Sequence, residues 1–426
     1  MLCSGAVPAP EIHPVEAIWR AEAGKVTARL VRLVRDVSLA EEIAQEALVA
    51  ALERWPETGV PENPGAWLMA TAKHRAIDEL RRLRRVAVKH EAIAQESESS
   101  TTPSFEEDAD DDVGDDLLRL VFVACHPVLA RDAQVALTLR LLGGVSTAEI
   151  ARAFLVSEPT IAQRIVRAKR TLADKQIPFE VPRGEELAPR LAAVLEVVYL
   201  VFNEGYSATA GEDWMRPALC EDALRFGRHL ADLVKAEPDT HALVALMEIQ
   251  ASRMSARVGP NGEPVLLLDQ DRSAWDHKRN ERGLLALVRA EETAGPGRLT
   301  PYRVQAQIAA CHARARRAGD TDWGRIAVLY AQLQQIAPSP VVELNRAVAL
   351  SMAFGPAAGL EVVDSIASDP ALAAYHLLPS VRGDLLAKLG RYDEARAELE
   401  RAARLTQNER ERAMLLERAK ACGKSS

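Results

Sequence analysis

The chain has 426 residues and a formal net charge of −8, so we expect two to four domains. Hydrophobic residues make up 48% of it and aromatic residues only 4%, which indicates an all-helical globular protein. No apolar run reaches the ~18–20 residues that a membrane-spanning helix needs, and the N-terminus lacks a signal-peptide pattern. We therefore expect a cytoplasmic protein with no membrane partner.

The cysteines and the absence of catalytic motifs argue against a metal site and against an enzyme. The five cysteines are far apart and form no CxxC pair, which is typical of reduced thiols in a cytoplasm. Two of them, Cys125 and Cys311, precede a histidine, but adjacent residues point to different faces and no second pair is near. The chain has no GxSxG, Walker loop, HExxH or GxGxxG. We expect no metal, no cofactor and no catalytic activity.

Residues 11–90 are predicted to form a helical domain. A helix over 39–55 has apolar residues at helical spacing. Its other side is expected to be exposed and to form an acidic patch of Glu41, Glu42, Gln45 and Glu46. Three prolines and a glycine in 56–64 predict a loop after this helix.

The stretch GAWLMATAKHRAIDELRRLRR (65–85) predicts a helix with one apolar and one basic side. The apolar side has Met69, Ala72, Ala76, Leu80 and Leu83. An arginine-rich front around a tryptophan suits a nucleic-acid backbone and an unstacked base. A solvated cationic helix is the alternative for this segment, and a core anchor is the alternative for Trp67. The basic side carries Trp67, Thr71, His74, Asp78, Arg81, Arg82 and Arg85.

Local charge decides the partner better than the net charge does. Residues 67–90 hold seven Lys or Arg against two acids, whereas residues 104–116 hold eight acids and no base. Residues 91–116 have almost no apolar side chains and are predicted to be an acidic, flexible linker.

VSTAEIARAFLVSEPTIAQRIVRAKRTL (145–172) predicts a helix-turn-helix within a second helical domain over 117–178. Ser146 and Glu149 form a capping-box pattern, and Ser157 is placed to cap the second helix. The predicted buried stripe of that helix is Ile161, Ile165, Ala168 and Leu172. Its outward face would bring to base edges and phosphates the side chains of Thr160, Gln163, Arg164, Arg167 and Arg170.

The rest of the chain is predicted to be a helical extension over 185–300 followed by repeats over 301–426. Residues 257–269 predict a short β-hairpin, and Asp269, Asp271 and Arg272 beside it are expected to form a salt-bridge network. In the last third, prolines 39 residues apart precede predicted amphipathic helices, and Gly319, Gly355 and Gly390 stand at turns. Such a period indicates helix pairs similar to tetratricopeptide repeats (TPR), with a plain helical bundle as the alternative.

Residues 11–178 resemble an extracytoplasmic-function (ECF) sigma factor of the sigma-70 family. DVSLAEEIAQEALVAALERW (36–55) resembles its polymerase-binding helix, and PENPGAWLMATAKHRAIDELRR (61–82) resembles its promoter-melting and −10-reading segment. The helix-turn-helix resembles the −35-reading unit. YLVFNEGYSA (199–208), DQDRSAWD (269–276) and the terminal repeats resemble the subgroup with a long C-terminal TPR-like extension.

The resemblance implies roles for these residues, with core RNA polymerase and promoter DNA as partners. The acidic patch of the first domain would dock on the polymerase. Trp67, His74, Arg75, Arg81, Arg82 and Arg85 would contact the −10 region. The outward face of the helix-turn-helix would contact the −35 region. We expect the acids of 105–116 to thread the polymerase cleft as a polyanion mimic, with a solvated spacer as the alternative.

The extension would regulate the sigma core in cis or contact polymerase, and its TPR-like part would bind a protein or peptide. Two other classes stay open. One is a helix-turn-helix regulator with a ligand- or protein-sensing repeat domain, which would need no strand-melting helix. The other is a repeat scaffold whose basic helices touch no DNA. Promoter-specific transcription by core polymerase separates the three.

Overall fold

The computed structural model of the chain describes residues 14–91, 112–154, 156–208, 210–211, 214–260, 262–295 and 299–423. Helices make up most of these residues, and the only strands there are two residues long, which confirms the all-α fold class. The chain divides into two compact units, residues 1–197 and 198–426. In the described ranges, no helix is both long enough and apolar enough to span a membrane.

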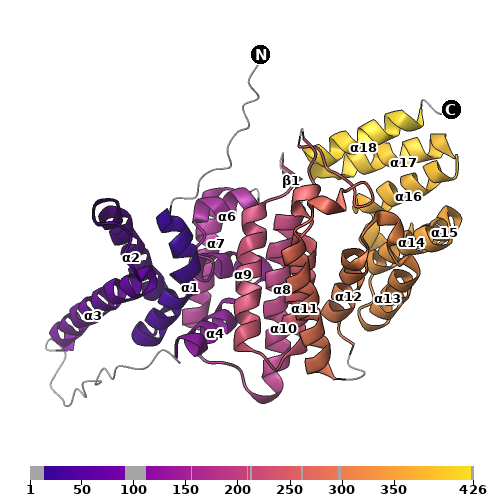
Figure 1. The fold of residues 1–426 in the computed structure, drawn as a ribbon. Helices are drawn as coiled ribbons and strands as arrows, with labels where there is room; N and C mark the ends of the chain where they lie inside the picture. The colour runs from indigo at the N-terminus through magenta and orange to yellow at the C-terminus, as the bar shows by residue number, and fades with distance from the viewer. Residues whose placement is uncertain are drawn as a thin grey trace. The chain divides into compact units, whose positions relative to one another are not determined.

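The three helices of the first domain are α1 (Pro14–Val34), α2 (Val37–Thr58) and α3 (Pro64–Glu91), drawn in indigo and purple in Figure 1. Asp36 begins α2 by accepting a hydrogen bond from the Leu39 N–H at 2.8 Å. Gly59 ends α2 with a φ of 80°, a value that favours glycine. The loop predicted over 56–64 is shorter than expected, because Pro56 lies inside the last turn of α2.

The second domain has α4 (Asp112–Ala124), α5 (Arg131–Leu141), α6 (Thr147–Ala153) and α7 (Glu158–Asp174). Its helix-turn-helix is formed by α6 and α7. The capping box is confirmed, since the Ser146 N–H donates to Glu149 at 2.9 Å and the Glu149 N–H donates to Ser146 Oγ at 3.2 Å. Ser157 caps α7 by accepting from the Thr160 N–H. The buried residues of α7 are those predicted: Ile161, Ile165, Ala168 and Leu172.

The predicted linker ends too late in the chain. Because α4 begins at Asp112, the last acids of 91–116 are helical. Asp116 has a fully buried side chain, and Arg29, Arg32 and Arg119 form ion pairs with its carboxylate at 2.7 to 3.4 Å. Asp116 therefore belongs to the packing between α1 and α4 and is not part of a free polyanion. The rest of the polyanion prediction lies largely on 92–111, outside the described residues.

The two small domains pack on each other through α1. Trp19, Ala23 and the glycine after it face α4 and the turn between α5 and α6, and the first two side chains are buried. Gly144 in that turn has a φ of 63°, and a Cβ there would lie 2.9 Å from Trp19 Nε1. Arg20 donates to Glu149, the capping-box acid of α6. We call this packing of α1–α3 on α4–α7 the closed arrangement.

The predicted boundary at 178–185 is displaced in the structure. α8 (Leu187–Tyr206) begins in the first compact unit and ends in the second, since the division falls after Val197. Arg190 donates to the Phe122 carbonyl at 2.7 Å, and Arg131 pairs with Glu196. The first half of α8 is therefore part of the first unit.

The second unit continues with ten helices among its described residues. They are α9 (Pro217–Leu233), α10 (Pro238–Ala251), α11 (His277–Ala294), α12 (Pro301–Arg314), α13 (Trp323–Ile336), α14 (Pro340–Phe354), α15 (Pro356–Ile366), α16 (Leu377–Lys388), α17 (Tyr392–Leu405) and α18 (Glu409–Cys422). Successive hydrophobic clusters share helices: α12 joins the α9–α12 cluster to the next, and α14 joins that one to the α14–α18 cluster. This stacking fits repeated helix pairs, but their assignment as TPR units stays a prediction.

Two details of the second unit differ from the prediction. Among the described residues of 257–269 none belongs to a strand, and the predicted hairpin is reduced to a turn with one antiparallel bridge between Val258 and Pro264. The strands are instead β1 (Ala210–Gly211) and β2 (Gln407–Asn408), which pair in parallel across almost 200 residues of sequence.

The predicted salt-bridge network around Arg272 is also wrong. The buried Arg272 guanidinium donates to the carbonyls of His312 and Ala315 and to Thr321 Oγ1, at 2.8 to 3.0 Å. Asp271 caps a short 3-10 helix by accepting from the Ser273 N–H. Among the described residues, neither Asp269 nor Asp271 pairs with Arg272.

The closed arrangement predicts that a methyl group added at Gly144 destabilises the protein. Gly144→Ala combines a left-handed backbone with a clash against Trp19, so we expect it to lower the free energy of unfolding by about 2–4 kcal/mol. Gly59→Ala is the matched control, because Gly59 is also left-handed but has no atom within 4 Å of the added Cβ. Denaturant unfolding measures both, and equal losses would contradict the packing.

Candidate nucleic-acid interface

The outward face of α7 is open to solvent. Thr160, Gln163, Arg167 and Arg170 are exposed, and Arg164 is half-buried. Two arginines of this face form ion pairs, and both pairs are long and weak. Arg164 Nη2 lies 3.4 Å from an Asp132 carboxylate oxygen, and Arg170 Nε lies 3.6 Å from an Asp174 carboxylate oxygen. The four buried residues of α7 fix its rotation, so the predicted face is the one that lies toward solvent.

The arginine face of α3 is also open. His74, Arg81, Arg82 and Arg85 are exposed. Arg82 pairs with Glu79 on the preceding turn at 2.6 Å, and this contact raises the pKa of the guanidinium. Arg85 Nε donates to the Arg81 carbonyl at 3.3 Å. These contacts are local and exposed, so phosphates can replace them at little cost.

Trp67 and Arg75, predicted to lie in the same site, are held more firmly. Trp67 is half-buried and packs edge-to-face against Trp55 of α2, with ring centroids 5.3 Å apart. Arg75 Nη1 donates to Glu46 of α2 at 2.6 Å. Both contacts fix α3 against α2, so Trp67 is at least partly the core anchor that was the alternative interpretation.

The acidic patch on α2 is not uniformly exposed, and this corrects the prediction. Glu42 and Glu46 are exposed and Gln45 is half-buried, but Glu41 is only 7% exposed. Its carboxylate accepts from Arg140 Nε of α5 at 2.5 Å and from Lys169 Nζ of α7 at 2.6 Å. We call this three-residue contact the Glu41 latch, because it joins the first domain to the second.

The charge of Glu41 depends on these two partners. Burial acts to raise the pKa of its carboxyl, but Lys169 and Arg140 outweigh burial and lower the pKa overall. A lowered pKa in the folded state means that the latch stabilises the closed arrangement above the ordinary carboxyl pKa of 4.5. This stabilisation is lost as the pH falls through the lowered value.

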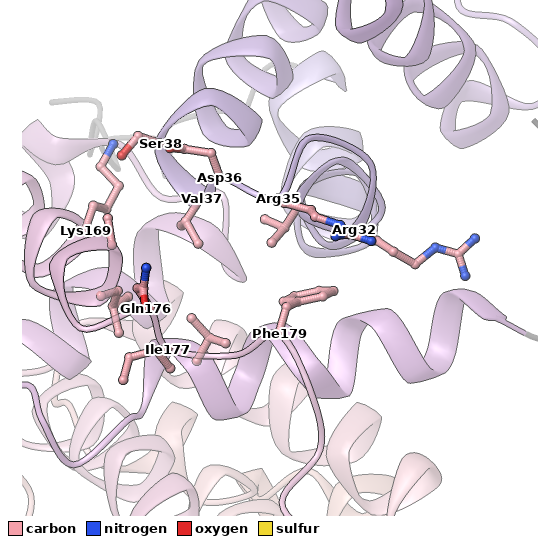
Figure 2. A pocket seen from close by; sticks show the side chains of 13 residues that line it. Arg32, Arg35, Asp36, Val37, Ser38, Lys169, Gln176, Ile177 and Phe179 are labelled. Atoms are coloured by element: carbon pink, nitrogen blue, oxygen red, sulfur yellow. The ribbon is translucent and has the colours of Figure 1, made fainter. Parts of the chain in front are cut away.

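A cavity of about 820 Å³ lies beside the latch and is lined by both domains (Figure 2). Arg32, Arg35 and Val37 face it from the end of α1 and the start of α2. Lys169 and Phe179 face it from α7 and the segment that follows. Since both domains supply its walls, this cavity exists only in the closed arrangement.

Sequence reasoning missed Arg140 and Lys169. Lys169 lies in the recognition helix, and Arg140 ends the preceding long helix, but neither carries a local pattern that points to Glu41. They are 99 and 128 residues away from it in sequence. The one available clue was Glu41 itself, because its position in α2 lies among the buried apolar residues of that helix and a buried acid needs a cationic partner.

Cys125, one of the two cysteines that precede a histidine, is buried. Burial raises the pKa of the Cys125 thiol to about 11, and its sulfur lies 3.3 Å from Thr138 Oγ1. A protonated, buried thiol is a poor metal ligand. Within the described ranges, no three His, Cys, Asp or Glu side chains are grouped as metal ligands would be.

Comparisons with known proteins agree with this geometry. The family model described as Sigma-70 region 2 matches residues 18–86, and Sigma-70, region 4 matches residues 119–172. A family of unknown function (DUF6596) matches residues 190–291. No solved structure matches the chain.

The curated relatives differ in how much of the chain they cover. An uncharacterized protein of Rhizobium meliloti is 43% identical over 91% of this chain and 90% of its own length. The ECF RNA polymerase sigma factor SigL of Mycobacterium tuberculosis is 29% identical over 40% of this chain and 92% of its own length. The probable ECF RNA polymerase sigma factor SigI of that organism is 26% identical over 53% of this chain and 81% of its own length.

Both sigma domains are matched in order, and one helix of each exposes a basic face. The chain belongs to the extracytoplasmic-function sigma factors of the sigma-70 family, in the subgroup with a long C-terminal helical extension.

Proposed function

We propose that this sigma factor reads the −35 element with α7 and opens and reads the −10 element with α3. As a member of its family, the chain directs core RNA polymerase to promoters and starts transcription there. The observation that carries the assignment of sites is the pair of exposed basic faces, one in each matched sigma domain. The proposed chemistry is binding alone, so we expect no catalytic activity of its own and a site of action in the cytoplasm.

The −35 assignment is supported by the side chains that α7 exposes near its N-terminal end. Thr160 and Gln163 lie in its first turns, where a recognition helix contacts base edges. Arg164, Arg167 and Arg170 follow along the helix and suit phosphate oxygens on either side of a major groove.

The −10 assignment is supported by the exposed arginines of α3 and the tryptophan at its start. Arg81, Arg82 and Arg85 would hold phosphates, with His74 beside them on the same helix. Trp67 is half-exposed while its ring packs on Trp55, which suits an aromatic support for a displaced base. Arg75 would have to exchange Glu46 for a phosphate.

The polymerase contact is assigned to the acidic face of α2. Glu42, Gln45 and Glu46 line a hollow of about 640 Å³ together with Arg140 and Lys169. A basic helix of polymerase would meet Glu42 and Glu46 directly. It can reach Glu41 only by displacing Arg140 and Lys169, so polymerase and the second domain compete for this carboxylate.

Promoter binding requires the closed arrangement to open. The two elements are about 25 base pairs apart, or roughly 85 Å at ~3.4 Å per base pair. A compact body of about 170 residues has a radius of gyration of only ~15 Å, and hence a diameter of about 40 Å. The closed domains therefore cannot occupy both elements together. Polymerase binding at Glu41 would remove the latch and favour separation.

We further propose that the extension regulates the sigma core in cis and that its TPR-like helices bind a protein or peptide. Stacked helix pairs present continuous surfaces for such partners. Truncation after Ser207 keeps all of α8, whose first half belongs to the first unit. If this truncated chain supported transcription in cells at the full-length level, the regulatory role would be refuted.

The function itself is tested by in vitro transcription with purified core polymerase. We expect the full-length chain to give promoter-specific transcripts that core alone does not give. Arg81→Ala combined with Arg82→Ala should lower open-complex formation on duplex promoters by roughly 10-fold or more, and less on a pre-melted bubble template. A conventional repressor or activator would bind duplex DNA yet give no transcripts with core.

Substitutions in the two halves of α7 should change DNA binding in different ways. Gln163→Ala removes a base contact and is expected to cost about 1–3 kcal/mol at particular base pairs of a duplex enriched from a random library. Arg167→Ala removes a phosphate contact, so it should weaken all duplexes alike and reduce the salt slope of binding by about 1. Fluorescence anisotropy at several salt concentrations measures both.

Arg183→Ala is the control for α7, because Arg183 is exposed and lies beyond its end. It should leave affinity and salt slope unchanged. The assignment of α7 would be contradicted if Arg183 behaved like Arg167, or if neither α7 variant changed binding.

The latch predicts that Glu41→Gln opens the free protein. The variant leaves two cations facing a neutral group, which should shift the closed equilibrium by about 1–2 kcal/mol. We expect the ratio of open to closed molecules to rise about 5- to 30-fold, which small-angle scattering would show as a larger radius of gyration. Binding to an isolated −35 duplex should not change, because the outward face of α7 is already exposed in the closed arrangement.

Glu42→Gln is the matched control, since Glu42 is exposed and adjacent in the chain. It removes the same charge but no contact between the domains, so the scattering profile should not change. Identical profiles for both variants and the parent chain would show that Glu41 does not hold the domains together.

A further inference from the structure

The second unit contains buried arginines that promoter recognition does not use. Arg253 follows α10, and Arg257 comes one turn later along the chain. Arg272 lies in the segment 269–276 that the sequence singled out. Arg253 is 9% exposed and Arg272 is 7% exposed, while Arg257 is partly buried. We call these three residues the arginine cluster.

Aromatic rings connect the three guanidinium groups. Tyr206, from the other singled-out segment (199–208), has its ring centroid 3.7 Å from the Arg257 Cζ and 5.8 Å from the Arg253 Cζ. Trp275 has its ring centroid 5.8 Å from the Arg253 Cζ and 4.9 Å from the Arg272 Cζ. Two sequence segments with no other assigned role thus meet at one place.

No carboxylate among the described residues forms an ion pair with the arginine cluster. Arg272 donates to carbonyls and a hydroxyl, and Arg257 donates to the Tyr206 carbonyl at 3.0 Å and to Met215 Sδ at 3.3 Å. The guanidinium of Arg253 makes no hydrogen bond to any described residue, and its Nε is fully buried without an acceptor. Arg272 Nε also lacks an acceptor, but the other nitrogens of Arg272 donate to carbonyls and a hydroxyl, so Arg253 is the least satisfied of the three.

Electrostatics makes this arrangement costly when nothing is bound. Burial lowers the pKa of Arg257 and Arg272, and the charge of Arg253 lowers both further. The same burial and charges lower the pKa of His312 to about 3, so its imidazole is neutral at physiological pH. An arginine keeps its proton at physiological pH, and the neutral carbonyls and rings around the cluster carry no negative charge, so a bound anion would compensate the buried charge most fully.

We propose that the arginine cluster binds a small oxyanion of the phosphate class, with the Arg253 guanidinium as its principal ligand. A phosphate group carries close to two negative charges, which matches several guanidinium groups better than a single carboxylate does. The planar fork of arginine binds two phosphate oxygens at once. The ring centroids of Tyr206 and Trp275 each lie 5.8 Å from the Arg253 Cζ, so both rings restrict the position of the fork.

The experiment uses the full-length chain and inorganic phosphate as the probe. Thermal unfolding is followed with increasing phosphate, against sodium chloride at equal ionic strength. We expect phosphate at about five times its dissociation constant to raise Tm by about 2–4 °C. Sulfate should compete for the site, and acetate should not. A cluster that holds only ordered water would show no difference between phosphate and chloride, which would overturn the proposal.

Variants locate the effect. Arg253→Gln should abolish the phosphate shift, and in phosphate-free buffer its Tm should equal or exceed that of the parent, since a buried unpaired cation is gone. Arg253→Lys keeps the charge without the fork, so phosphate affinity should fall about 10-fold even if the Gln variant folds poorly. Arg289→Gln, on the exposed face of α11, is the control and should respond as the parent does. A phosphate shift that survives in both Arg253 variants would overturn the proposal.

Discussion

The contact of one carboxylate with two cations from another domain governs the first unit. Glu41 belongs to the face of α2 that we propose for polymerase binding, yet Arg140 and Lys169 hold it in the closed arrangement. Lys169 in turn comes from α7, the helix that we assign to the −35 element. A single ion-pair cluster thereby engages both proposed binding surfaces of the sigma core, so in this proposal polymerase competes with the second domain for one side chain.

The closed arrangement does not hide the base-reading side chains. The outer faces of α3 and α7 stay exposed, and their own ion pairs are local and weak. In the proposed function, distance prevents promoter binding in this state, because two packed domains cannot reach two elements separated by more than two turns of DNA. The domains would therefore have to separate, and the Glu41 latch and the contact at Gly144 both oppose their separation.

The extension is held together mainly by hydrophobic clusters shared between successive helices. Its helices build one continuous stack of hydrophobic clusters, and two-residue strands join its first loop to its last helix. The arginine cluster lies within the segment 190–291 that matches a family of unknown function. A repeat stack with an internal cationic site has the two components of a sensor, a surface for a partner and a place for a small ligand.

Local features of this protein were determined by its sequence alone. The capping box at Ser146, the cap at Ser157 and the buried stripe of α7 follow from residues three or four positions apart, so their outcome needs no distant partner. The exposure of the α3 arginines follows from the same periodicity. Only the tertiary structure decided the burial of Glu41, whose partners are about a hundred residues away.

The same reason explains the ion pairs of Asp116, the carbonyl partners of Arg272 and the pairing of β1 with β2. In each case the hydrogen-bond or ion-pair partner of a charged or polar group comes from a distant segment of the chain. The hydrophobic periodicity of the sequence does not predict which segment that is. The sign of a charge predicts that such a group needs a partner, but the fold selects which one.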